Sequence, residues 1–361
     1  MKIGILTFHC AHNYGAVLQA FGLQQYLSQL GNEVEIINYQ PTYLTQIYNL
    51  FSINRFFSMA FHNKIRYILT EPIAIRRKYK RYRKFENFIH TMLTLSPEKL
   101  IHPHSIKGYD YIFFGSDQIW NPKLTHGFDP IYMGDFQSNA HFIAYAPSME
   151  TAQLSHEEQN KYIHYLKKFK AVSVREIKLK ELLQPLTDKK IELVCDPTFL
   201  LDSSQWNYIA GEAPLIKEKY ILVYQTRTQK KVLNIAKKIA KEKNCKIIRL
   251  SACFYWQYIP NLKQCISPID FLNLIKYAEF VVTTSFHGTA FSIIFNKDFF
   301  TIKLGDGKDN RAESILKLLS LENQLITTYT FPTHIDYSMS NILLQSFKEN
   351  SQTFIKRSIN Q

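Results

Sequence analysis

Residues able to carry chemistry gather after a run of β-branched residues late in the sequence. Residues 280–283 are typical of a buried strand, Ser285 interrupts the run, and His287 and Gly288 open a segment of helical length. Another apolar run follows residues 296–298, so the stretch predicts one β-α-β unit. Ligands of parallel sheets bind beyond the carboxyl ends of strands, where the first helix amides lack acceptors. We therefore predict an anion site at His287; a plain helix cap at Ser285 is the alternative.

Two more polar turns follow predicted strands earlier in the chain. After the strand at residues 2–8, Asn13 can cap a helix, and Gly15 leaves room for a ligand or a second backbone. After another strand, Asp117 could accept a proton from a sugar hydroxyl, and Trp120 could stack on a sugar ring. Capping alone would explain Asn13, and Asp117 could equally bond nearby amides. The spacing is not GxGxxG, so we expect no nicotinamide or flavin cofactor.

Three cations complete the set. The strand at residues 171–174 ends at Arg175, whose fork of N–H donors suits a carboxylate or a phosphate. Pairing of Arg175 with a local acid is the simpler alternative. Lys308 and Arg311 lie in the loop after the last strand of the β-α-β unit that contains His287, and both could close over an anion there.

The elements that must position these residues alternate between strand and helix in two series. We predict an α/β protein with two Rossmann-like β-α-β domains facing a cleft. The first covers residues 1–205 and contains an aromatic and basic helical insert at about 41–100, and the second covers residues 206–335. Residues 336–361 are expected to form a helical tail that packs back on the body.

Composition narrows the class of protein. The chain has 361 residues, 46% of them hydrophobic, and an excess of 44 Lys and Arg over 30 Asp and Glu gives a net charge of +14. This charge favours acidic partners. The five cysteines form no CxxC pair, which argues against a disulfide framework or a structural zinc site and favours a reducing cytosol. We find no signal peptide, no membrane-spanning segment and no cluster with metal-ligand spacing.

The strongest local charge feature is residues 76–84, where seven of nine residues are basic. Charge runs are usually solvated helix faces, and we take that as the default interpretation. The alternative is peripheral contact with anionic lipid at the inner face of the membrane. Nucleic acid is not expected, because one basic run without a reading module is weak support.

Five segments occur in the order found in the polysaccharide pyruvyl transferase family, and the chain resembles that family over residues 1 to about 330. They are Gly4 to His9 with Asn13 to Ala16, Gly115 to Asn121, Val174-Arg175-Glu176, Asp196-Pro197-Thr198 and Ser285 to Thr289. The resemblance implies a fold similar to GT-B glycosyltransferases. It also implies a ketal pyruvyltransferase that moves pyruvate from phosphoenolpyruvate, its co-substrate, onto two hydroxyls of a sugar. The acceptor would be a surface (exopolysaccharide or capsular) polysaccharide or its lipid-linked precursor.

The resemblance assigns donor binding and proton donation to His287, and contact with the donor's anionic groups to Arg175. Many family members have arginine where this chain has Ser285, and Arg311 or Lys308 is the hypothetical replacement. We thus expect the donor at Arg175, Ser285, His287, Gly288, Thr289, Lys308 and Arg311. We expect the acceptor at Asn13, Tyr14, Gly15 and Trp120, with Asp117 as its base.

Two other classes stay open. A nucleotide-sugar glycosyltransferase of GT-B type could use the same cations for a diphosphate, and it would release a nucleoside diphosphate. A non-catalytic partner in polysaccharide assembly would bind lipid through residues 76–84 and turn over neither donor.

Overall fold

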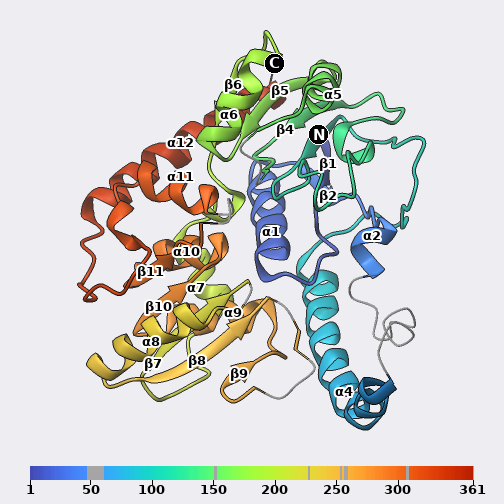
Figure 1. Cartoon of the computed structure of the whole chain (residues 1–361). Helices are drawn as coiled ribbons and strands as arrows, with labels where there is room; N and C mark the ends of the chain where they lie inside the picture. Colours follow the sequence, from blue (N-terminus) through green and yellow to red (C-terminus); the bar gives the residue numbers. More distant parts are fainter. Residues whose placement is uncertain are drawn as a thin grey trace.

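The computed structural model describes residues 1–46, 61–149, 153–226, 228–252, 254–255, 259–305 and 309–360, leaving out the side chains of residues 61–72. Two parallel sheets organise these residues (Figure 1). The N-terminal sheet has the order β2-β1-β3-β4-β5-β6. Its strands are β1 (Lys2–Leu6), β2 (Glu33–Ile36), β3 (Tyr111–Phe114), β4 (His141–Ala144), β5 (Phe169–Val174) and β6 (Ile191–Leu193).

The C-terminal sheet has the order β12-β11-β10-β7-β8-β9, which is the strand order of the dinucleotide-binding Rossmann fold. Its strands are β7 (Tyr220–Gln225), β8 (Lys246–Ser251), β9 (Leu262–Lys263), β10 (Phe280–Thr283), β11 (Phe299–Ile302) and β12 (Leu325–Ile326). The predicted α/β class with two Rossmann-like domains is therefore confirmed.

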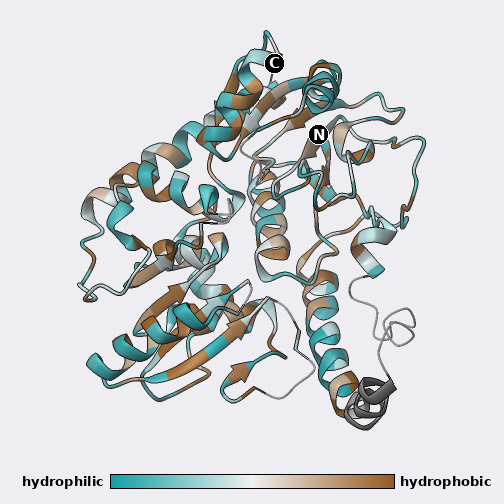
Figure 2. Cartoon of the chain, viewed as in Figure 1, coloured by the Kyte–Doolittle hydropathy of each residue, from teal (hydrophilic) through white to brown (hydrophobic). Residues whose placement is uncertain are grey.

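Helices cover both sheets, as parallel strands require. β3, β7, β10 and β11 are buried along their whole length, and their continuous apolar sequences reflect cover on both faces (Figure 2). The helices around the N-terminal sheet are α1 (Tyr14–Gln29), α2 (Thr42–Thr45), α4 (Phe61–Met92), α5 (His156–Leu166) and α6 (Ile177–Leu183). Those that follow are α7 (Ser203–Ala210), α8 (Lys230–Glu242), α9 (Pro268–Lys276), α10 (Phe286–Ile294), α11 (Asn310–Leu318) and α12 (Ser338–Asn360).

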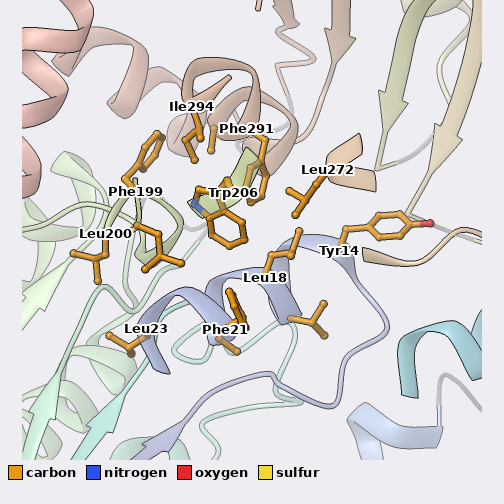
Figure 3. Packing of buried hydrophobic residues seen from close by; sticks show 14 of the residues in the cluster. Tyr14, Leu18, Phe21, Leu23, Phe199, Leu200, Trp206, Leu272, Phe291 and Ile294 are labelled. Atoms are coloured by element: carbon orange, nitrogen blue, oxygen red, sulfur yellow. The ribbon is translucent and has the colours of Figure 1, made fainter. Parts of the chain in front are cut away.

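The two halves share one hydrophobic core centred on α1. Trp206, which is fully buried, packs against Phe21 of α1 and against Phe291 of α10 (Figure 3). Tyr14, at the first turn of α1, stacks on Phe271 of α9 with ring centroids 4.8 Å apart. Aromatic pairs of this kind add about 0.5–1.5 kcal/mol beyond the burial of their area. These contacts between helices α1, α7, α9 and α10 hold the two domains against each other.

Helix α12 returns from the second domain to the first (Figure 1). Its Ser351 hydroxyl accepts a hydrogen bond from the amide of Cys195, and the carbonyl of Ile359 accepts one from the hydroxyl of Tyr111. Arg357 forms an ion pair with Glu192 of β6. The last helix thus belongs to the packing of the N-terminal sheet.

Candidate active site

His287 is positioned by the turn between β10 and α10. The hydroxyl of Thr283 accepts a hydrogen bond from the Ser285 amide at 3.0 Å and donates one to the Tyr224 carbonyl at 2.9 Å, which fixes the turn. A side chain at Gly288 would lie 2.3 Å from the Thr283 hydroxyl oxygen, so the helix can approach this closely only with glycine there. His287 then points out of the first turn, beside the point where the strand order of the C-terminal sheet reverses.

The imidazole of His287 lies against the backbone of the other domain. A Cβ atom built on Gly15 would be 1.9 Å from Nδ1 of His287, and its three nearest atoms all belong to that ring. Asn13 holds this part of α1 by accepting a hydrogen bond from the Gly15 amide at 3.0 Å, so its capping interpretation is confirmed. Gly15 therefore makes the close approach that its residue type suggested, and what approaches it is His287.

Arg175 forms the centre of a buried charge cluster at the carboxyl end of β5. Its Nη1 donates to the Asp196 carboxylate, and its Nε donates to Oε1 of Glu176 at 3.1 Å. The guanidinium carbon lies 4.5 Å from the ring centroid of Phe286 in α10. Nη2 is buried without a hydrogen-bond partner. Pairing with local acids, the simpler alternative for Arg175, is thus present, and the two N–H bonds of Nη2 remain for a ligand.

Asp196 connects Arg175 with the histidine. Oδ2 of Asp196 lies 3.8 Å from Nε2 of His287, and Oδ1 accepts hydrogen bonds from the amide and hydroxyl of Thr198. Nε2 of His287 is itself buried without a hydrogen-bond partner. Asp196, in the loop after β6, and His287, on α10, therefore meet across the domain interface, where Nε2 of His287 and Nη2 of the neighbouring Arg175 have no hydrogen-bond partner.

Burial and charge set the protonation of this cluster. Burial lowers the pKa of His287 to about 4, which the carboxylates of Asp196 and Asp117 only partly offset. Burial tends to raise the pKa of the Asp196 carboxyl, but Arg175, His287 and the hydrogen bonds from Thr198 together outweigh it, so that pKa is lowered. Burial raises the pKa of the Glu176 carboxyl above its ordinary value despite Arg175. At neutral pH the imidazole is accordingly neutral and Asp196 is ionised.

Asp117 and Arg311 lie within electrostatic reach of these groups. Asp117, nearly buried after β3, acts through its charge on both Arg175 and His287. Arg311, in the first turn of α11, acts on both Glu176 and His287. Lys308 lies outside the described residues. The structure thus brings together Asp117, Arg175, His287 and Arg311 from four separate segments.

Ser285 and Thr289 have mainly local roles. Ser285 occupies the N-cap position of α10, but its side chain makes no capping hydrogen bond, so the plain cap is not what the structure shows. The hydroxyl of Thr289 lies 2.6 Å from that of Thr301 on β11 and 3.2 Å from the carbonyl of Ser285. Thr289 is fully buried and ties the helix to the sheet.

Two residues expected on the acceptor side are core residues. The indole of Trp120 is 1% exposed, donates to the carbonyl of Tyr132 at 3.1 Å and packs edge-on against Tyr162 and Phe169. A ring buried in this way presents no face to a sugar, so stacking by Trp120 is corrected to a packing role. Tyr14 is likewise fully buried, between Phe271 and Phe85.

The basic run in α4 contains a buried residue that was predicted to be solvated with its neighbours. Arg81 donates hydrogen bonds to the carbonyls of His12, Ala252 and Gln264 at 3.2, 2.8 and 3.2 Å. Its guanidinium also lies 5.3 Å from the ring centroid of Tyr14. Arg81 therefore joins the N-terminal domain to the loops that follow β8 and β9. Exposed cations of the run are Arg76, Lys80 and Arg83.

Glu176, Asp196 and Ser148 were not among the predicted site residues, although two of them lie in segments that carried the family resemblance. Each follows a strand of the N-terminal sheet, at the edge where ligands bind. Their position directly after a strand is the sequence signal that could have identified them.

Within the described part of the chain, no group of three or more His, Cys, Asp or Glu side chains is arranged to hold a metal ion. No helix among those residues is long and apolar enough to span a bilayer.

Comparisons with known proteins agree with the motifs. The sequence matches the model of the polysaccharide pyruvyl transferase family over residues 13–305. A search of curated proteins gave no match. Among solved structures, a functionally uncharacterised protein from Klebsiella pneumoniae is 14% identical, with 71% of this chain and 88% of that chain covered at a TM-score of 0.42.

Two further solved structures are similar at low sequence identity. The UDP-GlcNAc 2-epimerase of Methanocaldococcus jannaschii is 10% identical, covering 97% of this chain and 100% of its own at a TM-score of 0.42. A heptosyltransferase of E. coli with ADP is 12% identical, with 97% and 100% covered at a TM-score of 0.38. Because the family match runs from the residue before α1 to the loop after β11, this chain belongs to the polysaccharide pyruvyl transferase family.

Proposed function

We propose that this protein transfers pyruvate from phosphoenolpyruvate to two hydroxyls of a sugar, forming a ketal and releasing phosphate. The acceptor is a surface polysaccharide or its lipid-linked precursor. The observation that carries the proposal is the pair of unpartnered buried groups, Nη2 of Arg175 and Nε2 of His287, which Asp196 links across the domain interface in a chain of this family. An unpaired buried N–H such as those of Nη2 of Arg175 costs about 1–3 kcal/mol, so a ligand that supplies acceptor oxygens would recover that energy.

Phosphoenolpyruvate carries a carboxylate and a phosphate, and its anionic oxygens match the hydrogen-bond donors of the site. Arg175 offers Nη2, and the Ser285 side chain makes no capping hydrogen bond to the first-turn amides of α10. Arg311, on α11, acts through its charge on His287 and Glu176 of the same cluster. This supports Arg311 as the replacement for the arginine that many family members have at the position of Ser285. Lys308 stays a prediction. No cofactor or metal beyond phosphoenolpyruvate itself is proposed.

The reaction requires acid and base chemistry at carbon. Protonation of the methylene carbon creates a cationic centre that one sugar hydroxyl attacks, and a second hydroxyl then displaces phosphate. A neutral His287 can accept the proton of the attacking hydroxyl, because burial keeps its pKa low and its Nε2 is unpartnered. Asp117 acts through its charge on both Arg175 and His287, and the alternative in which Asp117 is the acceptor's base stays a prediction.

The test is phosphorus NMR of the purified protein with phosphoenolpyruvate and a set of free and lipid-linked oligosaccharides. We expect acceptor-dependent release of inorganic phosphate by the wild type, and its loss in His287→Ala. The matched control is His334→Ala, because His334 is an exposed histidine paired with Asp298 far along the chain from α10. Release of a nucleoside diphosphate from a nucleotide-sugar panel, with no phosphate from phosphoenolpyruvate, would instead establish a glycosyltransferase.

We further propose that the protein acts in the cytoplasm, with peripheral contact at the inner face of the membrane through residues 76–84. Arg76, Lys80 and Arg83 are the exposed cations that could contact anionic lipid, each adding about 1 kcal/mol before screening. Arg81 is excluded from this role by its burial. Flotation with anionic vesicles should exceed flotation with neutral vesicles and should fall when these three residues are changed to Gln. A purely solvated face predicts no difference.

A further inference from the structure

Glu176 is a buried carboxyl whose position the proposed binding roles do not explain. It is the residue after Arg175, at the N-cap of α6, yet its side chain caps nothing there. Oε1 accepts hydrogen bonds from the Ser148 hydroxyl at 2.7 Å and from Nε of Arg175 at 3.1 Å. Oε2 is buried and has no hydrogen-bond partner. Glu176 is 1% exposed, and its ion pair with Arg175 satisfies Oε1 only, so an ionised carboxylate would leave Oε2 buried at a cost.

The surroundings of Glu176 favour a bound proton. Burial raises the pKa of its carboxyl, and the groups that oppose this are Arg175, the Ser148 hydroxyl and Arg311. The remaining charged or titratable groups of the cluster are Asp196, Asp117 and His287, of which Asp196 is held ionised by Arg175. A proton on Oε2 removes the buried charge and turns the unpartnered oxygen into a donor.

The environment pushes the carboxyl and the imidazole in opposite directions. Burial lowers the pKa of His287 to about 4, so the imidazole is neutral when the carboxyl is protonated. Two titratable groups whose pKa values are pushed apart in this way can serve as an acid and a base in one site. Both touch the same ion pair, since Arg175 contacts Glu176 directly and Asp196 lies between Arg175 and His287.

We propose that Glu176 is the general acid that delivers a proton to the methylene carbon of phosphoenolpyruvate, and that His287 is the base for the attacking hydroxyl. This rests on the proposed function. The O–H bond of Glu176 breaks, a C–H bond forms at the methylene, and the double-bond electrons leave a cationic carbon. The first sugar oxygen bonds to that carbon and its proton passes to His287. The second sugar oxygen then displaces phosphate, which departs with that hydroxyl's proton, and the proton on His287 restores Glu176.

The other carboxyls of the cluster are poorer candidates. Asp196 carries no proton to give, because it accepts from Arg175 and from both donors of Thr198. A neutral imidazole is a far weaker acid than a carboxyl, so His287 suits proton acceptance in the first step. Among Glu176, Asp196 and His287, Glu176 is the group that combines an unpartnered carboxyl oxygen with a raised carboxyl pKa.

The first experiment compares wild type with Glu176→Gln, which keeps the size and the acceptor oxygen but cannot transfer a proton. We expect kcat to fall at least about 100-fold while the donor KM changes little, since an acid contributes about 10²–10⁴ to the rate. The matched control, Glu157→Gln, changes an exposed glutamate on α5 and should leave the kinetics unchanged. Near-normal kcat in Glu176→Gln would overturn the acid role.

A second variant guards against a purely structural effect. Ser148→Ala removes a hydrogen bond that lowers the pKa of Glu176, so the limb of the kcat profile that falls at high pH should move to higher pH. A merely structural Glu176 predicts lower activity with an unmoved limb. A wild type that releases no phosphate with any acceptor would overturn the proposed function. An active wild type whose high-pH limb does not move in Ser148→Ala would overturn only the assignment of Glu176 as the acid.

Discussion

Gly15→Ala tests whether the two domains meet as described. The change adds a single methyl group on α1, at a position whose three nearest neighbours all belong to the His287 ring. In a helix, alanine is favoured over glycine by up to about 1 kcal/mol, so the substitution alone should stabilise α1. Any loss must therefore come from the contact across the interface.

The size of the effect follows from the distance. A Cβ atom 1.9 Å from Nδ1 is far inside the shortest contact of real Cβ atoms, so the ring must move by more than about 1 Å. Overpacking of this kind costs about 1–3 kcal/mol of unfolding free energy. A displacement of about 1 Å at a reacting group costs about 100-fold in rate. We expect both losses in Gly15→Ala.

A double-mutant cycle in urea denaturation isolates the contact. In a His287→Ala background the new methyl group has no ring to meet, so Gly15→Ala should become neutral or slightly stabilising, giving a coupling of about 1–3 kcal/mol. Gly22→Ala is the control on the same helix. Its Cβ would lie 2.6 Å from the Pro197 carbonyl oxygen, so its cost should be equal in both backgrounds. Equal cost of Gly15→Ala in both backgrounds would refute the described interface.

Four further outcomes are expected. Arg81→Met should lower the unfolding free energy by about 3 kcal/mol, because several buried carbonyls lose their donor, while exposed Arg83→Met should change little in the same urea titration. The pKa of His287 is about 4 in the folded protein, against an ordinary value of 6.5. Between pH 4 and pH 6.5 the unfolded chain therefore binds more protons than the folded protein. Wild type should therefore lose up to about 3 kcal/mol more than His287→Asn as pH falls from 6.5 to 4, and parallel curves would contradict this. Trp120→Phe should lower stability and leave acceptor KM unchanged, and a raised KM would restore a sugar contact. Phosphate release should survive treatment with a chelator, and recovery only on added metal would show that the site needs an ion.

Much of the fold was predictable because its signals are local. Apolar runs of four to six residues ending in polar turns identified the strands, and Asn13 and the glycine at residue 15 identified the start of α1. Five short segments in order carried the family. The residues at strand ends were found for the same reason, since a parallel sheet places them at one edge.

Which side chains contact each other within the site could not be predicted from the sequence. Asp196 is 21 residues from Arg175 and meets it only because β5 and β6 are neighbours. Sequence cannot distinguish an aromatic ring that stacks on sugar from one that fills a core, and Trp120 proved to be the second. Arg81 carried an unused signal: it precedes the buried Phe85 by four residues and Phe88 by seven, so all three lie on one face of α4.

Helix α12 bears on the order in which the two domains can complete their folding during synthesis. It is translated after every strand of the second domain, yet Ser351, Arg357 and Ile359 bond to residues around the first sheet. During vectorial synthesis the first sheet therefore waits, partly uncovered, while the second domain emerges from the ribosome. We expect the N-terminal domain to be covered only after the second domain has been synthesised, so a nascent chain halted before residue 338 should expose that surface to chaperones.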